Sequence, residues 1–140
     1  MSLLIKKYYK IGKHQLYPIC RSITGKGIKK TLRIIKDNFS ELKILREYSG
    51  SQVFDWKIPP EWNIYDAYVI DKTGKKIINF KKNNLHLVGY SIPVNKIVNK
   101  NTFLQHLHSL PDKPSAIPYI TSYYKKYWGF CVTDFEKKKI

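Results

Sequence analysis

Residues 63–80 read NIYDAYVIDKTGKKIINF and contain the clearest β-hairpin pattern of the chain. Two apolar-rich runs, 63–71 and 76–80, flank the turn sequence KTGK. Both runs are rich in Ile, Val, Tyr and Phe, the residue types that favour strands. Gly74 can adopt the positive φ that a tight turn requires. The sequence therefore predicts an antiparallel pair of strands here.

Further strand patterns lie on both sides of this hairpin. Residues 42–46 form a short apolar run, 53–58 alternate apolar and polar side chains, and 85–91 form a third run. A short helix is expected at 103–107, capped by Asn101 or Thr102. Two more apolar segments, 120–124 and 128–133, follow an irregular proline-containing loop at 111–118.

The first fifty residues are predicted to be mainly helical, with the pattern changing to β from about residue 42. Leu3, Leu4, Tyr8 and Ile11 recur at helical spacing, and Pro18 is expected to end or kink this first helix. The chain is therefore expected to have an α+β fold.

A second helix is expected over residues 25–36, with Thr24 as its N-cap. Ile28, Leu32 and Ile35 fall on one face of that helix, and most of its basic residues fall elsewhere. This pattern favours a helix that packs on a core and exposes a lysine-rich face to solvent.

Composition limits the class of protein. The chain has 140 residues, 43% of them hydrophobic, which is enough for a compact folded structure and argues against extended disorder. Lysine interrupts every apolar run, so no membrane span is expected. The first residues lack the pattern of a secretory signal, and Cys20 and Cys131 lie far apart. A reduced, cytoplasmic protein is therefore expected.

The net charge of +16 is compatible with nucleic-acid binding, but the type and the distribution of the basic residues argue against it. Of the 26 basic residues, 23 are lysine, whereas arginine is the residue that recognises phosphates and bases in a bidentate way. Lys, Ile, Asn and Tyr share AT-rich codons, so genome composition can account for much of the excess. The charge is also spread, with +9 over residues 1–50 and +7 over residues 51–140.

No self-contained active site is evident from motifs. The four histidines lack metal-ligand spacing, and His106 and His108, two residues apart, would lie on different faces of a helix. Cys20 as a nucleophile is less favoured than a small buried thiol. The Gly25-Lys26-Gly27 sequence lacks the rest of a phosphate-binding loop. No catalytic residue and no metal ligand is therefore predicted.

Two other groups of residues are weaker candidates for a site. Asp55, Glu61 and Asp66 lie among Trp and Tyr residues, but solvated or salt-bridged acids are the expected case in a lysine-rich chain. The aromatic cluster over 119–128 could stack bases or a sugar beside its lysines, although packing is favoured on burial statistics.

Several strings resemble a bacterial aminopeptidase-like family, much of which is described only as a domain of unknown function. The strings occur in family order over nearly the whole chain: LYPICRSITG at 16–25, VFDW at 53–56, IPPEWNI at 58–64, NNLHLVGYS at 83–91, HSLP at 108–111, AIPYITSYY at 116–124 and WGFC at 128–131.

This resemblance implies an architecture and an activity for the full-length protein. Members are similar to zinc aminopeptidases, with an α/β core interrupted by a small protease-associated-like β domain. Residues 1–47 would then be the first helices of the peptidase-like core. Residues 48–118 would be most of the inserted β-rich domain, and residues 119–140 would return to the missing core.

The resemblance also implies that this chain is not catalytic alone. The family's metal-binding residues follow the WGFC string, so the zinc expected in full-length members would have no ligands here, and no cofactor is expected in this chain. By position in the motifs, Arg21 is predicted to bind a carboxylate or phosphate group of a peptide-like or small-molecule substrate, with Tyr124 and Trp128 as pocket walls. Structural roles for these three residues are favoured over the substrate role on burial statistics.

Three functions remain open on the sequence. The first is an N-terminal fragment of an aminopeptidase-like protein, with the catalytic half as a possible separate polypeptide and an exposed apolar face where that half docks. The second is a stand-alone, non-enzymatic module that binds a protein or glycan through its β domain. The third is a basic nucleic-acid-binding protein that uses the helix at 25–36.

Overall fold

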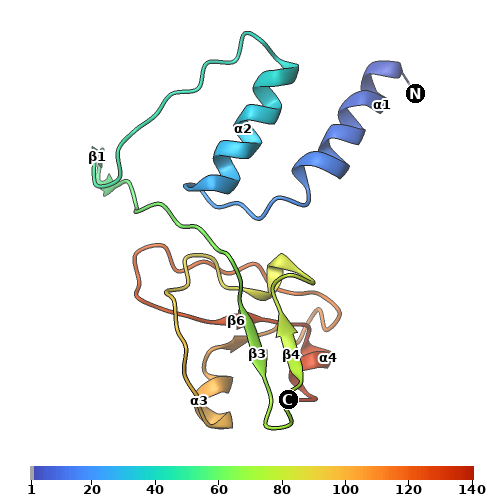
Figure 1. Cartoon of the computed structure of the whole chain (residues 1–140), viewed down its shortest axis with the longest axis vertical. Coiled ribbons are helices and arrows are strands. Elements are labelled where there is room, and N and C mark those ends of the chain that lie inside the picture. Colours follow the sequence, from blue (N-terminus) through green and yellow to red (C-terminus); the bar gives the residue numbers. More distant parts are fainter. Residues whose placement is uncertain (1) are drawn as a thin grey trace. The chain divides into compact units, whose positions relative to one another are not determined.

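The computed structural model describes residues 2–140 and confirms the α+β class (Figure 1). The chain divides into two compact units, Met1–Asn63 and Ile64–Ile140. The resemblance divides the chain differently, into 1–47, 48–118 and 119–140, as parts of a longer protein. The two compact units do not test that division, which remains a prediction. No helix within residues 2–140 is both long and apolar enough to cross a membrane.

The first unit begins with two consecutive helical segments. Helix α1 covers Leu3–Lys10 and starts at Ser2, whose hydroxyl accepts a hydrogen bond from Leu4 N at 3.3 Å. It continues as the π-helix η1, Ile11–Leu16. The regular helix ends at Leu16, and Tyr17, directly before Pro18, is its C-cap and keeps helical φ and ψ angles of −56° and −42°. Pro18 has no backbone N–H to continue the helical hydrogen bonds, in keeping with the predicted end of this helix.

Helix α2 covers Lys26–Asn38, close to the predicted range, but its N-cap is Gly25 and not Thr24. Gly25 has φ +91°, which glycine adopts without strain. The Thr24 hydroxyl instead donates to Pro60 O at 3.2 Å and accepts from Trp62 N at 3.3 Å. Competition from this distant segment is therefore the reason that the predicted cap is wrong.

The strand predicted at 42–46 is wrong, because these residues have no regular structure. The strand predicted at 53–58 is also wrong as a single element. It forms a tight hairpin of β1, Gln52–Val53, and β2, Trp56–Lys57, in which Val53 pairs with Trp56. Alternating polarity cannot distinguish one strand from a hairpin whose turn lies inside the alternating run.

The second unit begins with the predicted hairpin, which is confirmed. Strand β3, Tyr68–Ile70, pairs antiparallel with β4, Lys76–Asn79. Gly74 has φ +85° in the turn, and Asp71 Oδ1 accepts a hydrogen bond from Thr73 N at 2.9 Å. Strand β3 is shorter than the predicted run of 63–71.

The strand predicted at 85–91 is wrong. Asn83 accepts a hydrogen bond from Leu85 N at 3.0 Å and starts a 3-10 turn, η2, over Asn84–His86. The residues that follow form only two isolated bridges, Leu87 with Phe130 and Gly89 with Thr121.

Helix α3 covers Lys100–Leu104 and is capped by Asn99, so it begins and ends three residues before the predicted helix. Strand β5, Leu107–His108, then pairs in parallel with β6, Phe130–Cys131. The short helix α4, Asp134–Lys137, follows β6 with a capping box formed by Thr133 and Glu136.

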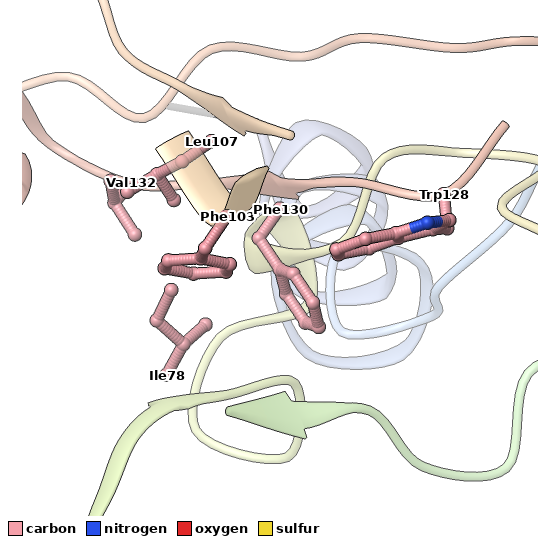
Figure 2. Close-up of a cluster of buried hydrophobic side chains, with 6 residues drawn as sticks. All are labelled: Ile78, Phe103, Leu107, Trp128, Phe130 and Val132. Carbon is pink, nitrogen blue, oxygen red and sulfur yellow. The ribbon is translucent and has the colours of Figure 1, made fainter. Parts of the chain in front are cut away.

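The hydrophobic core belongs to the second unit. Figure 2 shows its central side chains, contributed by β4, α3, β5, β6 and the flanking residues: Ile78, Phe103, Leu107, Trp128, Phe130 and Val132. The run 128–132 is buried throughout, as its apolar sequence predicts. By contrast, the buried residues of the first unit within 2–63 are Gly25, Thr31 and Pro59.

Candidate functional site

Two motif strings of the first unit meet at the start of α2. Besides the Thr24 bonds to Pro60 and Trp62, Asn63 Oδ1 accepts a hydrogen bond from Lys26 N at 2.7 Å. The Asn63 side chain therefore satisfies one of the backbone N–H groups that a helix start leaves without an intrahelical partner. Lys29 and Glu61 form an ion pair across the same junction.

Glycine is required at this junction for reasons of space. A Cβ at Gly25 would lie 2.2 Å from Trp62 O, and a Cβ at Gly27 would lie 2.2 Å from Cys20 O and 2.9 Å from Arg21 Cα. The backbone of residues 20–21 and that of residue 62 thus both pack directly on the first turn of α2. Gly25 and Gly27 do not form a phosphate-binding loop. Their lack of a side chain allows this close packing instead.

Arg21, a predicted substrate-binding residue, has a structural contact in this unit. Its Nη1 donates a hydrogen bond to Leu16 O at 2.6 Å, at the C-terminal end of η1, and the bond is exposed. A guanidinium carries five N–H donors, so this contact occupies only part of its capacity. The predicted role toward an anionic group therefore remains a prediction.

An open hollow of about 580 Å³ lies between η1 and α2 of the first unit. Its lining comes from the end of η1, the following turn and α2: His14, Gln15, Pro18, Ile19, Cys20, Lys30 and Ile34. Burial raises the pKa of the Cys20 thiol, which disfavours the thiolate form that a nucleophile needs. The hollow therefore offers polar and apolar lining without an activated thiol.

Trp128 and Tyr124, the two predicted pocket walls, lie in different environments of the second unit. Trp128 is 8% exposed and belongs to the core cluster, with Lys96 Nζ 4.8 Å from its ring centroid. Tyr124 is 63% exposed. Arg21 belongs to the first unit. Tyr124 and Trp128 belong to the second unit, so the predicted role of the three residues in one substrate site stays a prediction.

Two histidines of the second unit form hydrogen bonds to backbone carbonyl groups within residues 128–131. His86 Nδ1 donates to Cys131 O at 2.8 Å, and His106 Nδ1 donates to Trp128 O at 2.6 Å. A carbonyl oxygen only accepts, so Nδ1 must carry the proton in both rings. These bonds attach β6 and its preceding residues to two segments distant in sequence.

His108 completes the arrangement through Tyr127. The Tyr127 hydroxyl donates to Gln105 O at 3.3 Å, and its oxygen is hydrogen-bonded to His108 Nε2 at 2.8 Å. Burial lowers the pKa of His108, and the positive charge of Lys137 and the neighbouring His106 add to this shift. Burial likewise raises the pKa of Tyr127. The neutral forms of both side chains are therefore favoured.

We call His86, His106, His108 and Tyr127 the histidine clasp. This clasp is not evident from the sequence, because a helix at 103–107 would place His106 and His108 on different faces. In the structure His106 follows α3 and His108 lies in β5, so both rings reach Tyr127, with ring-centroid distances of 5.0 and 5.9 Å. Residues two apart share one face of an extended chain, and this spacing was the available signal.

The part of the chain that the structure describes does not bring together a set of side chains that could bind a metal ion. Within residues 2–140 no three His, Cys, Asp or Glu residues lie together as a metal ion would need. Burial also raises the pKa of Cys131 to about 11, which disfavours the thiolate that zinc binds. The described residues therefore do not fit the zinc site expected in full-length relatives.

Comparison with known proteins gives one family and two similar proteins. Residues 61–140 match a family described as "Domain of unknown function (DUF2172)". A Clostridium acetobutylicum protein is 50% identical over 120 residues, 86% of this chain, and its name provisionally assigns it to polysaccharide biosynthesis with an aminopeptidase-like domain. A crystal structure from the same organism, provisionally named a peptidase, matches with TM-score 0.85, 43% identity and 98% of this chain covered.

Both similar proteins are much longer than this chain. The chain spans 27% of the length of the curated relative and 35% of the crystallised one. Because 120 matched residues are 27% of the curated relative, that relative has about 440 residues.

Proposed function

The chain belongs to the DUF2172 family, and on that basis we propose that it forms the N-terminal part of a longer aminopeptidase-like protein. The observation that carries this proposal is the asymmetry of the structural match. Nearly all of this chain, 98%, corresponds to only 35% of the crystallised relative. In this account residues 1–47, 48–118 and 119–140 are, in order, core helices, most of an inserted β-rich domain, and the return segment.

The apolar surface of the first unit supports the proposal. On α1, Leu4, Ile5 and Tyr9 are each more than half exposed, while neighbouring Tyr8 stacks on Phe39 with ring centroids 5.2 Å apart. Helices that form a stable core bury an apolar stripe against other elements. The first unit buries little by itself, which fits helices that complete their packing on a further part of the protein.

The assignment of catalysis to another part of the protein rests on the metal ligands, which are not found together among the described residues. Zinc aminopeptidase chemistry needs metal ligands and a carboxylate base, and the described residues do not fit a zinc site. We therefore assign zinc binding and hydrolysis to the remaining part of the longer protein, within the same polypeptide or a separate one. In that protein Arg21, Tyr124 and Trp128 would contribute to binding a peptide-like or small-molecule substrate.

The proposal is tested by comparing the 140-residue chain with the protein as its own cells produce it, which we call the natural product. This protein is recovered from the cells with antibodies against the chain. Zinc content and release of amino acids from aminoacyl p-nitroanilides are measured on both. The account predicts zinc and activity in the natural product only. Stoichiometric zinc binding and hydrolysis by the 140-residue chain would contradict it.

A further inference from the structure

The hairpin of β1 and β2 has a well-defined backbone. Gly50 N donates to Ile58 O at 2.8 Å, and Ile58 N donates to Ser51 O at 3.0 Å, extending the ladder beyond the two short strands. Pairing of Val53 with Trp56 leaves a loop of only two residues, Phe54 and Asp55. Such a loop must satisfy strict demands on its φ angles.

Phe54 occupies a position that strongly favours glycine. Its φ is +52°, whereas Asp55 is not among the positive-φ residues of the structure. A positive φ at the first loop residue alone is the pattern of a type II′ turn, which takes glycine there. For a bulky side chain this backbone region is a genuine outlier. The side-chain amide of Gln52 donates to Phe54 O at 2.8 Å and helps to hold the strained turn.

Burial of the ring among the described residues, 2–140, does not compensate for this strain. Phe54 is 94% exposed, and Trp56 on the adjacent strand is 42% exposed. An exposed phenylalanine gains almost none of the hydrophobic free energy that its burial would supply. Neither the chemistry of the turn nor packing against the part of the chain that the structure describes therefore accounts for phenylalanine at this position.

We propose that Phe54 is an aromatic anchor that inserts into an apolar pocket on the remaining part of the longer aminopeptidase-like protein. This inference rests on the proposed function, which supplies the occupant: about two thirds of the crystallised relative lies outside the region that matches this chain. Aromatic side chains that fill pockets carry much of the binding energy of protein interfaces. A rigid two-residue turn presents such a side chain with little loss of conformational entropy on docking.

The experiment uses three substitutions at one position, Phe54→Gly, Phe54→Asn and Phe54→Tyr. Glycine and asparagine accept positive φ and remove the ring, whereas tyrosine keeps an aromatic ring. Tyr48→Ser is the matched control, because Tyr48 is 86% exposed without a positive φ. Thermal unfolding is measured for the 140-residue chain and for the natural product carrying the same substitutions.

The proposal predicts opposite behaviour in the two proteins. In the 140-residue chain, Phe54→Gly leaves the melting temperature unchanged or raises it, because glycine relieves the turn. In the natural product, Phe54→Gly and Phe54→Asn lower the melting temperature, while Phe54→Tyr and Tyr48→Ser do not. If the remaining part is a separate polypeptide, its dissociation constant rises roughly tenfold or more with the first two substitutions.

Four results would overturn the proposal, and they separate it from the proposed function. A longer natural product that is indifferent to Phe54→Gly overturns this inference alone. So does a lower melting temperature of the 140-residue chain with that substitution, because the ring would then pack within the chain. Self-association of the chain that Phe54→Gly abolishes would identify a second copy as the occupant. A lone natural product of 16.5 kDa would remove the proposed function as well.

Discussion

His106 lies flat against Trp128, with ring centroids 3.8 Å apart and planes 12° apart, and its Nδ1 donates to the carbonyl oxygen of the same residue at 2.6 Å. The imidazole thus fixes both the side chain and the backbone at residue 128. The ring also stacks on Tyr127, with centroids 5.0 Å apart. A residue predicted as a pocket wall is in this way built into the core of the second unit.

Gly129 is predicted to be essential for this packing. In Gly129→Ala the new Cβ would lie 2.8 Å from Tyr127 Cε1 and 3.0 Å from His106 O, and the backbone oxygen cannot easily move. We expect a loss of about 1–3 kcal/mol in the free energy of unfolding, the usual cost of overpacking. Urea denaturation measures it. Gly12→Ala, with open space around Gly12, is the control and should not destabilise the chain.

The second unit is predicted to lose stability as the pH falls through the histidine range. The folded-state pKa of His108 lies below its ordinary value of 6.5, so below about that pH the unfolded chain binds more protons. Stability is complete above this value and falls as the pH drops toward the folded-state pKa. The hydrogen bond from the Thr73 hydroxyl lowers the pKa of Asp71 from 3.8, so that carboxylate stays ionised in this window.

His108→Gln supplies the control for this pH dependence. Melting temperatures measured between pH 7.5 and roughly pH 5 should vary less in the variant than in the natural sequence, since glutamine does not titrate. Equal slopes in the two proteins would show that another group titrates in this range.

Gly25 and Gly50 separate two reasons for glycine in the first unit. Both have positive φ, +91° and +89°, but only at Gly25 would an added Cβ meet a close neighbour, Trp62 O at 2.2 Å. Gly50→Ala should cost about 1–2 kcal/mol through backbone strain alone. Gly25→Ala should cost clearly more, because it also forces the motif strings apart. Circular dichroism at 222 nm follows the loss of helix, and equal costs would contradict the close packing.

Trp128 and Tyr124 require different tests of their predicted substrate role. Trp128→Ala removes a buried core ring and should cost about 3–5 kcal/mol, so its loss of activity would not be informative. Tyr124→Ala changes an exposed side chain and should alter stability by no more than about 0.5 kcal/mol. A raised KM of the natural product with unchanged melting temperature would support the substrate role of Tyr124. An unchanged KM would exclude it.

Local chemistry explains which parts of the fold could be predicted. The β3–β4 hairpin depends on residues within the turn, above all Gly74, and it was predicted correctly. The burial of residues 128–132 could also be predicted, because a run of consecutive apolar residues is stable mainly in the interior of a protein. In contrast, the strand predicted at 85–91 failed because the Asn83 side chain binds Leu85 N and starts a turn.

Long-range contacts explain what the sequence analysis missed. Thr24 was predicted as a cap from its neighbours alone, but its hydroxyl bonds to residues 36 and 38 positions away. The histidine clasp likewise depends on the pairing of β5 with β6, which joins Leu107 to Phe130. No local pattern reports such a pairing between two-residue strands, so the role of His106 could not be derived before the structure.

The most direct test of the account is the mass of the native polypeptide in its own cells, measured by immunoprecipitation and intact mass spectrometry. The account predicts a mass well above 16.5 kDa, or a co-purifying partner that carries the zinc ligands. A lone species of 16.5 kDa without zinc would contradict it and would favour a stand-alone binding module.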